Sequence, residues 1–195
     1  KSEKAKIWQT AIGLQDVDGL KPSEYLIKTA EQHIEGDITI SEVKGLIDSY
    51  YESKGVRLDV EQKSTEEADK VAARITEILS EKSFSFTPDF LVRIHQRLFS
   101  GVFEHAGQFR QKNISKREWI LEWDTVTYSG YDMIRQTLDY DFAQEKGTDY
   151  PSMTADQAIK RICKFVSGIW QIHPFAEGNT RTTAVFAMKY LQTYG

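Results

Sequence analysis

Apolar residues recur at helical spacing through most of the second half of this chain, and this periodicity constrains the fold more than any other feature. The spacing predicts helices over 64–81, from Pro88 onward, from Ser129 onward, over 154–173 and after Gly178. Only four prolines and twelve glycines interrupt the 195 residues, so long helices meet few breaks. We therefore expect an all-α fold built as a helical bundle.

Local sequence signals mark the ends of these helices. Ser64 with Glu67 three residues later has the pattern of a capping box, and Thr154 begins a second one. Pro174 disfavours helical geometry in the residue before it, so the helix from Thr154 is expected to end near His173. Because that helix is apolar on most sides, we expect it to lie at the centre of the bundle.

One segment has the character of a β-hairpin instead. Residues 117–128 are rich in Trp, Ile, Val, Thr and Tyr, and residues 122–124 supply a polar turn. Two strands alone are marginally stable, so this hairpin is expected to lie across the helices rather than to form a core sheet.

Residues 1–55 form a separable N-terminal segment. Glycines and a proline divide it into short amphipathic pieces, notably 23–34 and 41–51, and the charged stretch 58–63 marks a boundary. We therefore expect an N-terminal helical segment over 1–55 and a core over 56–195. The chain stops soon after its last predicted helix, so further helices are expected beyond residue 195.

Composition limits the class of protein. Hydrophobic residues make up 40% of the chain, which is enough for a buried core and excludes a disordered protein. The 25 basic and 29 acidic residues give a net charge of −4, so the basic surface of a nucleic-acid-binding protein is not expected. No apolar run approaches a membrane span of about 20 residues, and no signal peptide is recognisable. These features predict a cytoplasmic protein with no nucleic-acid or membrane partner and leave its oligomeric state open.

Residues 172–181 carry the candidate chemistry. They comprise a helix end, a turn and the first residues of a new helix, whose free N–H groups and positive dipole end can bind an anion. Gly178 allows a phosphate to approach the backbone closely, and Asn179 and Arg181 add side-chain donors. A phosphate-binding site is therefore predicted at the start of this helix.

Two further side chains complete the pattern. His173 titrates near neutrality and can take a proton from a hydroxyl, and Glu177 is suited to a Mg²⁺ ion that bridges phosphates. Taken separately, a His-Pro pair often only ends a helix and Gly-Asn is a common turn. Their conjunction favours attack of a hydroxyl on a nucleotide phosphate. His95 is interpreted as a packed helix residue, and Cys163 as a buried small apolar residue.

The same segment resembles the signature of Fic (Fido) domains, His-Pro-Phe-x-(Asp/Glu)-Gly-Asn-Gly-Arg-x-x-Arg. The matching residues are His173, Pro174, Phe175, Glu177, Gly178, Asn179 and Arg181. Residues 94–110 resemble the stretch that precedes the hairpin in that family, and 117–128 fall where the family carries its flap. The resemblance covers about residues 64–193.

This resemblance implies a Fic-type helical bundle with a small β-hairpin flap over the active site, with the catalytic core over 56–195. It implies a protein adenylyltransferase that moves AMP from ATP to a hydroxyl of a target protein. His173 would be the general base and Glu177 the Mg²⁺ ligand. The nucleotide phosphates would be held by Gly178, Asn179, Thr180 and Arg181.

The resemblance also implies how the target binds. The flap would pair with an extended segment that presents a Ser, Thr or Tyr, as in strand addition. The flap residues expected to bind the target are Trp119, Ile120, Leu121 and Glu122. The alternative is that Trp119 and Trp123 pack on the helices.

Two departures from the signature leave a second function open. Thr180 replaces a glycine, and Ala184 replaces the second arginine, which in the family orients the terminal phosphates. The alternative is a weak or degenerate Fic-fold module that binds nucleotide or protein without turnover, and another nucleotide donor is an intermediate interpretation. Arg110 or Lys112 is a candidate to replace the missing cation.

The segment 1–55 resembles the small antitoxin subunits of some Fic pairs, particularly over 34–43. Relatives are inhibited by a helix with the pattern Ser/Thr-x-x-x-Glu-Gly/Asn. Glu35 and Asp18 each precede a glycine here, but Glu31 and Leu14 stand at the Ser/Thr position. We therefore expect a fused, toxin–antitoxin-like autoinhibitory segment with Glu35 or Asp18 as the inhibitory residue. The alternative is an extension that only packs on the core.

Overall fold

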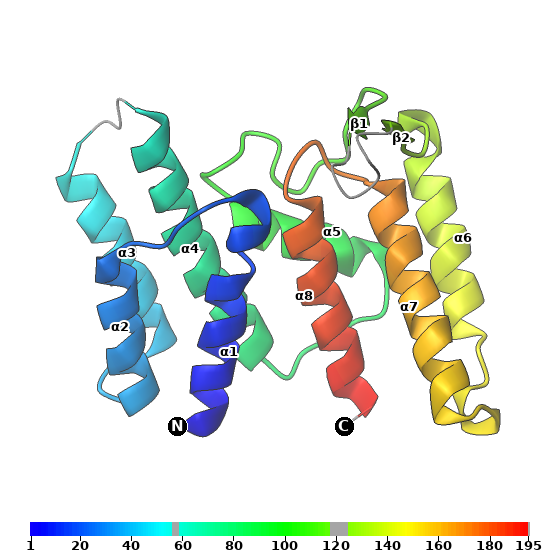
Figure 1. Cartoon of the computed structure of the whole chain (residues 1–195), viewed down its shortest axis with the longest axis horizontal. Coiled ribbons are helices and arrows are strands. Elements are labelled where there is room, and N and C mark those ends of the chain that lie inside the picture. The colour runs from blue at the N-terminus through cyan, green and yellow to red at the C-terminus, as the bar shows by residue number, and fades with distance from the viewer. Residues whose placement is uncertain (56–58, 118–124, 195) are drawn as a thin grey trace. The chain divides into compact units, whose positions relative to one another are not determined.

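The computed structural model describes residues 1–55, 59–117 and 125–194, and most of these residues are helical, which confirms the all-α class (Figure 1). The helices are α1 (Ser2–Gly13), α2 (Glu24–Glu35), α3 (Ile40–Ser53), α4 (Val60–Ser80), α5 (Pro88–Phe99), α6 (Ile134–Lys146), α7 (Ala155–Ile172) and α8 (Asn179–Leu191). The two short strands are β1 (Ser115–Arg117) and β2 (Thr125–Thr127). In this part of the chain, no helix combines the length and apolarity needed to cross a membrane.

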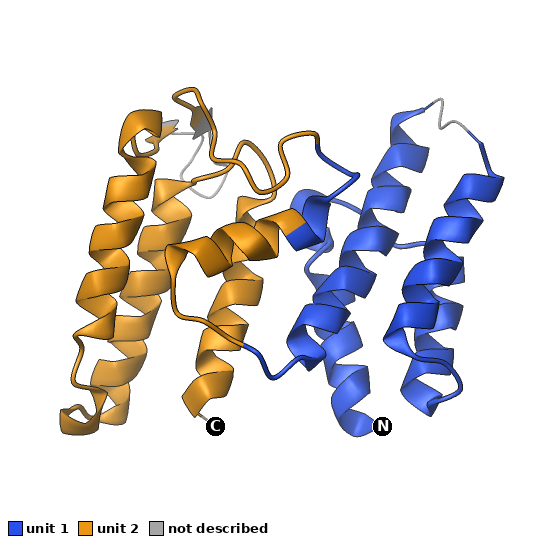
Figure 2. Ribbon diagram, turned by 180° about the vertical axis from the view of Figure 1, so that it is seen from behind, with its two compact units in different colours: residues 1–83, 97–103 blue, residues 84–96, 104–195 orange. Residues whose placement is uncertain are grey.

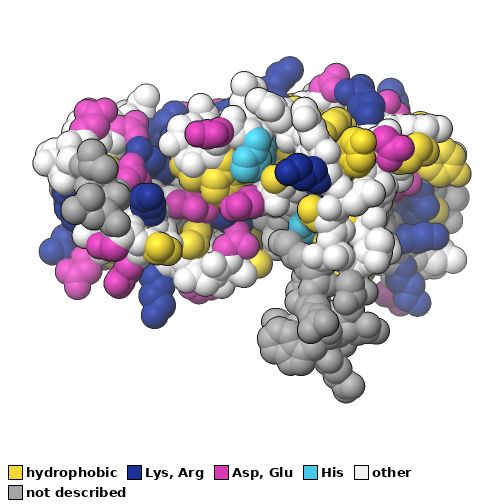
Figure 3. Space-filling model, turned by 90° about the horizontal axis from the view of Figure 1, so that it is seen from above, with side chains coloured by type: hydrophobic (Ala, Val, Ile, Leu, Met, Phe, Trp, Pro, Cys, Tyr) yellow, Lys and Arg dark blue, Asp and Glu magenta, His cyan; other side chains and the backbone are white. Residues whose placement is uncertain are grey.

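The chain divides into two compact units (Figure 2). The first unit holds residues 1–83 and 97–103, and the second holds 84–96 and 104–195. The first unit therefore includes α4 as well as the predicted N-terminal segment. On the face drawn in Figure 3, acidic and basic side chains are interspersed, in keeping with the small net charge of −4.

Several predicted helix ends agree with the structure. The Thr154 hydroxyl accepts a hydrogen bond from the Gln157 amide, and Oε1 of the Gln157 side chain accepts one from the Thr154 amide, which confirms this capping box. The Thr87 hydroxyl accepts from the Phe90 amide at 3.2 Å and so caps α5.

Other predicted ends were wrong. Helix α4 begins at Val60 rather than at Ser64, because the Asp59 carboxylate caps it by accepting from the Gln62 amide at 2.7 Å. Ser129 does not cap α6, since a single 3₁₀ turn, Tyr131–Met133, precedes that helix. Helix α1, whose Trp8 is almost fully buried, was not predicted from the sequence.

The expected central position of α7 is wrong as well. Its buried residues are Phe165, Ile169 and Ile172, whereas Cys163 is exposed and Ile159 is 59% exposed. Helix α8 buries more of its length, including both charged and polar side chains. The apolar stripe of α7 is wider than the surface that α6 and α8 cover, so part of the stripe is exposed to solvent. Helical periodicity shows where the stripe lies but not how much of it a neighbouring helix covers.

In the first unit, α4 packs against α1 and α3. Its fully buried Asp69 accepts hydrogen bonds from the Ser23 amide at 2.8 Å, the Ser23 hydroxyl at 2.5 Å and the Tyr51 hydroxyl at 2.7 Å. Ser23 is in turn the N-cap of α2 and accepts from the Leu26 amide. One carboxylate therefore connects the start of α2, the end of α3 and the middle of α4.

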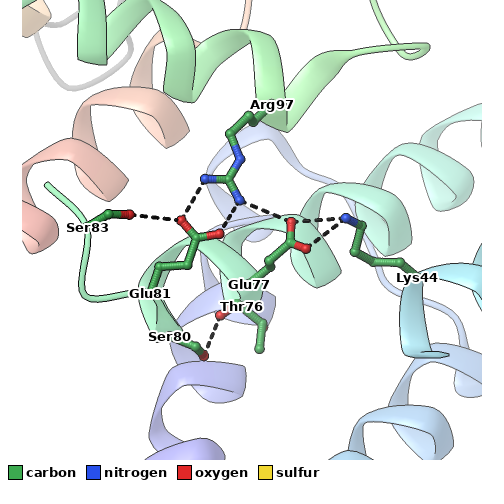
Figure 4. Close-up of polar contacts among 7 residues, drawn as sticks. All are labelled: Lys44, Thr76, Glu77, Ser80, Glu81, Ser83 and Arg97. Carbon is green, nitrogen blue, oxygen red and sulfur yellow. Dashed lines mark hydrogen bonds and ion pairs between the residues drawn. The ribbon is translucent and has the colours of Figure 1, made fainter. Parts of the chain in front are cut away.

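A second polar network in this unit surrounds Arg97 near the end of α5 (Figure 4). Its guanidinium donates to both oxygens of Glu81, at 2.8 and 2.5 Å, and to Glu77 at 3.2 Å. Glu77 also accepts from the Lys44 ammonium on α3 at 2.9 and 3.0 Å. These side chains are 22–36% exposed, so solvent screens the network and its contribution to stability is small.

The second unit contains α6, α7 and α8 around an aromatic core. The rings in contact are Phe84, Phe86, Phe142, Phe165, Phe186 and Tyr190. Strands β1 and β2 pair antiparallel with Ser115 opposite Thr127, which confirms the predicted hairpin. Its predicted turn at 122–124 lies outside the described residues.

We predict that Asp69→Ala destabilises the first unit by roughly 3 kcal/mol, because it leaves the Ser23 amide and the Tyr51 hydroxyl without their acceptor. Urea unfolding of the full chain measures this change. Asp37→Ala removes an exposed carboxylate from the same unit and is the control. Equal unfolding midpoints for the two variants would contradict the prediction.

Candidate active site

The turn between α7 and α8 places the predicted site residues together. Helix α7 ends at His173, whose φ of 52° and ψ of 61° are left-handed, and α8 begins after Gly178, whose φ is 72°. Among the described residues, His173 is the one non-glycine residue with a positive φ. Such a conformation costs on the order of 1 kcal/mol and persists where the surroundings enforce it.

Arg110 enforces the conformation of this turn. Its side chain is 5% exposed, and its Nε donates to the His173 carbonyl at 2.8 Å while Nη2 donates to the Ile172 carbonyl at 3.2 Å. Nη1 donates to the Lys112 carbonyl at 2.7 Å, and Nη2 also contacts the carbonyl of Ser129. Burial lowers the pKa of the guanidinium from its ordinary value.

The guanidinium thus occupies the negative end of the α7 dipole and binds carbonyls that have no partner within the helix. The Arg110 amide adds a bond to the Pro174 carbonyl at 2.9 Å. Because this guanidinium is committed to backbone carbonyls, Arg110 does not serve as the replacement for the missing signature arginine.

The His173 imidazole is held on several sides. It is 3% exposed and stacks on Tyr128 with ring centroids 4.1 Å apart. Its Nδ1 lies 3.3 Å from the Trp170 carbonyl, which can only accept, so the neutral ring carries its proton on Nδ1 and its lone pair on Nε2. This tautomer makes Nε2 the atom that can take up a proton.

The start of α8 has the geometry of an anion site. The first turn of a helix leaves its N–H groups without acceptors inside the helix, and here that turn is Asn179, Thr180 and Arg181. The Asn179 side chain is used elsewhere: its Oδ1 accepts from the Phe175 amide at 2.9 Å and its Nδ2 donates to the Phe175 carbonyl at 2.8 Å. Asn179 therefore shapes the loop, and its backbone N–H remains in the first turn.

The two departures from the signature have clear positions. The Thr180 hydroxyl accepts a hydrogen bond from the Trp170 indole at 3.1 Å, so this side chain is tied to the last turn of α7. Ala184 lies on α8 and is half-buried. The Arg181 side chain is 2% exposed, and its charge is one of the causes that lower the pKa of His95.

His95 on α5 supports the loop from its other end, a role that the sequence analysis missed. Its Nδ1 accepts from the Gly107 amide at 2.8 Å, and its Nε2 donates to the Glu177 carbonyl at 3.1 Å. The ring is fully buried and stacks on Phe175 with centroids 3.8 Å apart. The signal that could have revealed it is Gly107. Its φ is 77°, and a Cβ at this position would lie only 2.8 Å from Cβ of Gln96, so the position strongly favours glycine.

Glu177 is the residue that could hold a metal ion. In the described ranges, no group of three or more His, Cys, Asp or Glu side chains forms a metal site. Mg²⁺ bound through phosphates needs only one or two carboxylates from the protein. The exposed Glu177 carboxylate, directly before the N-cap of α8, meets this requirement.

Not all predicted residues can be placed. Trp119, Ile120, Leu121 and Glu122 lie outside the described residues. Glu35 ends α2 and forms an ion pair with Lys1. Asp18 lies in a 3₁₀ turn of the same unit, and the inhibitory role of both acidic residues stays a prediction.

Comparison with known proteins identifies the family. The model of the Fic/DOC family matches residues 85–191, more than half of the chain, and the chain therefore belongs to this family. The matched range contains His95, Arg110 and the whole α7–α8 turn. No curated protein matches the chain.

Solved structures share the fold. One is a Fic family protein from Desulfovibrio desulfuricans, with 14% identity and a TM-score of 0.61, and the match covers 98% of this chain and 49% of that one. Another is the N-terminal Fic domain of a VirB-translocated Bep effector protein from Bartonella quintana, with 19% identity and a TM-score of 0.58, and the match covers 73% of this chain and 69% of that one. A third is a Fic-domain-containing signalling protein from Bacteroides thetaiotaomicron, with 16% identity and a TM-score of 0.57, and the match covers 100% of this chain and 68% of that one. The chain spans about half the length of the first protein, and identities this low show the fold alone.

We predict that the stability contributed by His95 is lost as the pH falls. Burial lowers the pKa of His95 from 6.5 to about 4, so below pH 6.5 the unfolded chain takes up a proton that the folded chain refuses. The contribution is complete above pH 6.5 and declines by roughly 3 kcal/mol as the pH falls to 4.

The measurement is urea unfolding of the wild type and of His95→Asn between pH 7 and pH 4. The asparagine retains an acceptor for Gly107 but does not titrate, so His33 and the carboxylates contribute equally to both curves. The variant should be less stable at pH 7 and the difference should shrink toward pH 4. Parallel curves would show that His95 does not carry the effect.

Proposed function

We propose that this protein is an adenylyltransferase that transfers AMP from ATP to a hydroxyl side chain of a target protein. The observation that carries the proposal is the α7–α8 turn, which holds the left-handed His173 beside the N-terminus of α8. A base and an anion site on one turn suit attack of a hydroxyl on a phosphate. Members of the Fic/DOC family generally transfer a nucleoside monophosphate to proteins, which supports the proposal.

In this mechanism the amides of the first turn of α8 and the Arg181 side chain bind the phosphates. Nε2 of His173 accepts the proton of the target hydroxyl as its oxygen attacks the α-phosphorus. The new P–O bond joins AMP to the target, the bond to the bridging oxygen breaks, and pyrophosphate leaves. Glu177 would hold Mg²⁺, which when bound offsets the charge of the phosphates. The hairpin would pair with an extended segment of the target.

A second candidate function is nucleotide or protein binding without turnover. Two observations favour it: Thr180 is tied to Trp170 across the first turn of α8, and Ala184 supplies no cation for the terminal phosphates. Calorimetry with ATP and Mg²⁺ that shows binding, together with no label transfer to any lysate protein, would select this function over the first.

We predict that His173→Ala lowers AMP transfer by roughly a hundred-fold or more, because it removes the general base. The assay incubates the protein, Mg²⁺ and a cell lysate with ATP labelled at the α-phosphate, and a parallel reaction uses a label at the γ-phosphate. His105→Ala, a half-buried histidine of the same unit, is the control and should retain transfer. Transfer of the γ label, or full activity of His173→Ala, would refute the mechanism.

We predict that Ala184→Arg raises AMP transfer roughly ten- to a hundred-fold, since a charge-assisted contact to the terminal phosphates is restored. In the predicted inhibition, the new arginine would pair with Glu35 or Asp18. Glu35→Ala and Asp18→Ala are therefore combined with Ala184→Arg, and these point variants keep α1 and α3 in place on α4.

Higher activity when either acidic residue is removed from the Ala184→Arg protein would identify the inhibitory residue. Equal rates for all of these proteins would show that position 184 is not the limiting contact. That result would also remove the evidence for autoinhibition through an ion pair.

A further inference from the structure

A groove of about 330 Å³ lies in the second unit, between the end of β2 and helices α6 and α7. Its walls include Tyr128 after β2, Asp141 on α6, and Gly168 and Gln171 on α7. The volume is at the lower end of the range of small-ligand sites, about 300–1,000 Å³, and suits one long side chain. The groove plays no part in the phosphate site described above.

Tyr128 connects this groove with the proposed base. Its ring stacks on His173 with centroids 4.1 Å apart, and the same residue borders the groove. Two residues of extended chain span about 7 Å. This length is close to the width of the Tyr128 ring together with its contacts to His173 on one side and the groove on the other. A peptide that presents its hydroxyl to His173 therefore brings a side chain about two residues away to the groove.

Asp141 gives the groove its charge. Burial raises the pKa of its carboxyl, and the positive charge of Arg161 opposes this shift. Arg161 itself forms an ion pair with Glu145 at 3.0 Å and donates a hydrogen bond to the Thr148 hydroxyl at 3.2 Å. Across the described residues, no hydrogen bond or ion pair satisfies the Asp141 carboxylate, whereas the nearby Asp139 is paired with Arg135 at 3.0 Å.

Gly168 keeps this carboxylate accessible. A Cβ at position 168 would lie 3.3 Å from Oδ2 of Asp141, which is tighter than ordinary van der Waals contact. A larger side chain would cover the carboxylate from the α7 side. Because Gly168 has no side chain, the Asp141 carboxylate stays open to the groove on the side that faces α7.

We propose that this groove is a subsite for a Lys or Arg side chain of the protein target, and that Asp141 binds its cationic group. The inference rests on the proposed function and adds a specificity for a basic residue near the modified hydroxyl. A single carboxylate in a groove next to the base suits a target cation, and a metal ion would need further ligands. The occupant belongs to the target because Thr127 of the hairpin strand β2 lines the groove, and Tyr128 in its wall stacks on His173.

Peptide specificity tests the subsite. The probes are peptides with a central Ser and with Lys, norleucine or Glu at each flanking position, and kcat and KM are measured with ATP and Mg²⁺. With the wild type, Lys at one position about two residues from Ser should lower KM about fivefold to tenfold relative to norleucine, at similar kcat. Asp141→Asn should abolish this preference, and Asp141→Lys should transfer it to Glu.

Asp139→Asn is the matched control, because it removes an exposed carboxylate of the same helix, and it should retain the preference for Lys. Gly168→Val should reduce the preference without removing the carboxylate. Equal KM values for Lys and norleucine at every position in the wild type would overturn the proposal.

A binding measurement separates this proposal from the proposed function. NMR spectra of the full chain are recorded with n-propylguanidinium, and with n-butanol as the neutral comparison. Shifts at Asp141 and Gln171 with the guanidinium alone, absent in Asp141→Asn, support the subsite even where no peptide is modified. Transfer to peptides without any such shift and without a preference for Lys would retain the enzyme and refute the subsite.

Discussion

The bonds from the buried Arg110 guanidinium to the backbone carbonyls at the end of α7 are the interaction on which the site depends. A helix end leaves such carbonyls without partners, and a cation there is favoured by the helix dipole. Here the same bonds hold His173 in a left-handed conformation that a histidine rarely adopts. The backbone strain thus lies at the residue that we propose as the general base.

Three further carbonyls of the turn accept hydrogen bonds from buried side chains. His95 donates to the Glu177 carbonyl, Asn179 to the Phe175 carbonyl, and the Thr182 hydroxyl to the Gly178 carbonyl. These acceptors are thus directed into the protein. The N–H groups at the start of α8 have no acceptors within the helix, so this end of the turn suits an anion.

Aromatic side chains connect the α7–α8 turn with the neighbouring groove. Tyr128 stacks on His173 and borders the groove that contains Asp141, so His173 and the groove share one ring. Trp170, whose carbonyl orients His173, also binds Thr180 through its indole. Thr180, which replaces the signature glycine, is therefore part of the packing of α7 against α8. The arginine that is missing at position 184 is not replaced by Arg110, because the Arg110 guanidinium binds backbone carbonyls.

Local patterns in the sequence were sufficient for α5, α7, α8, the hairpin and the 172–181 turn, because capping and helical periodicity depend on residues within about four positions of one another. They failed for the start of α4 at Asp59 and for the burial of Cys163, since several caps compete locally and an apolar face is buried only where a neighbour covers it. The supporting roles of Arg110 and His95 join residues 63 and 82 positions apart. Contacts of that range leave no periodic trace in the sequence, so only the tertiary structure decided which side chains hold the α7–α8 turn.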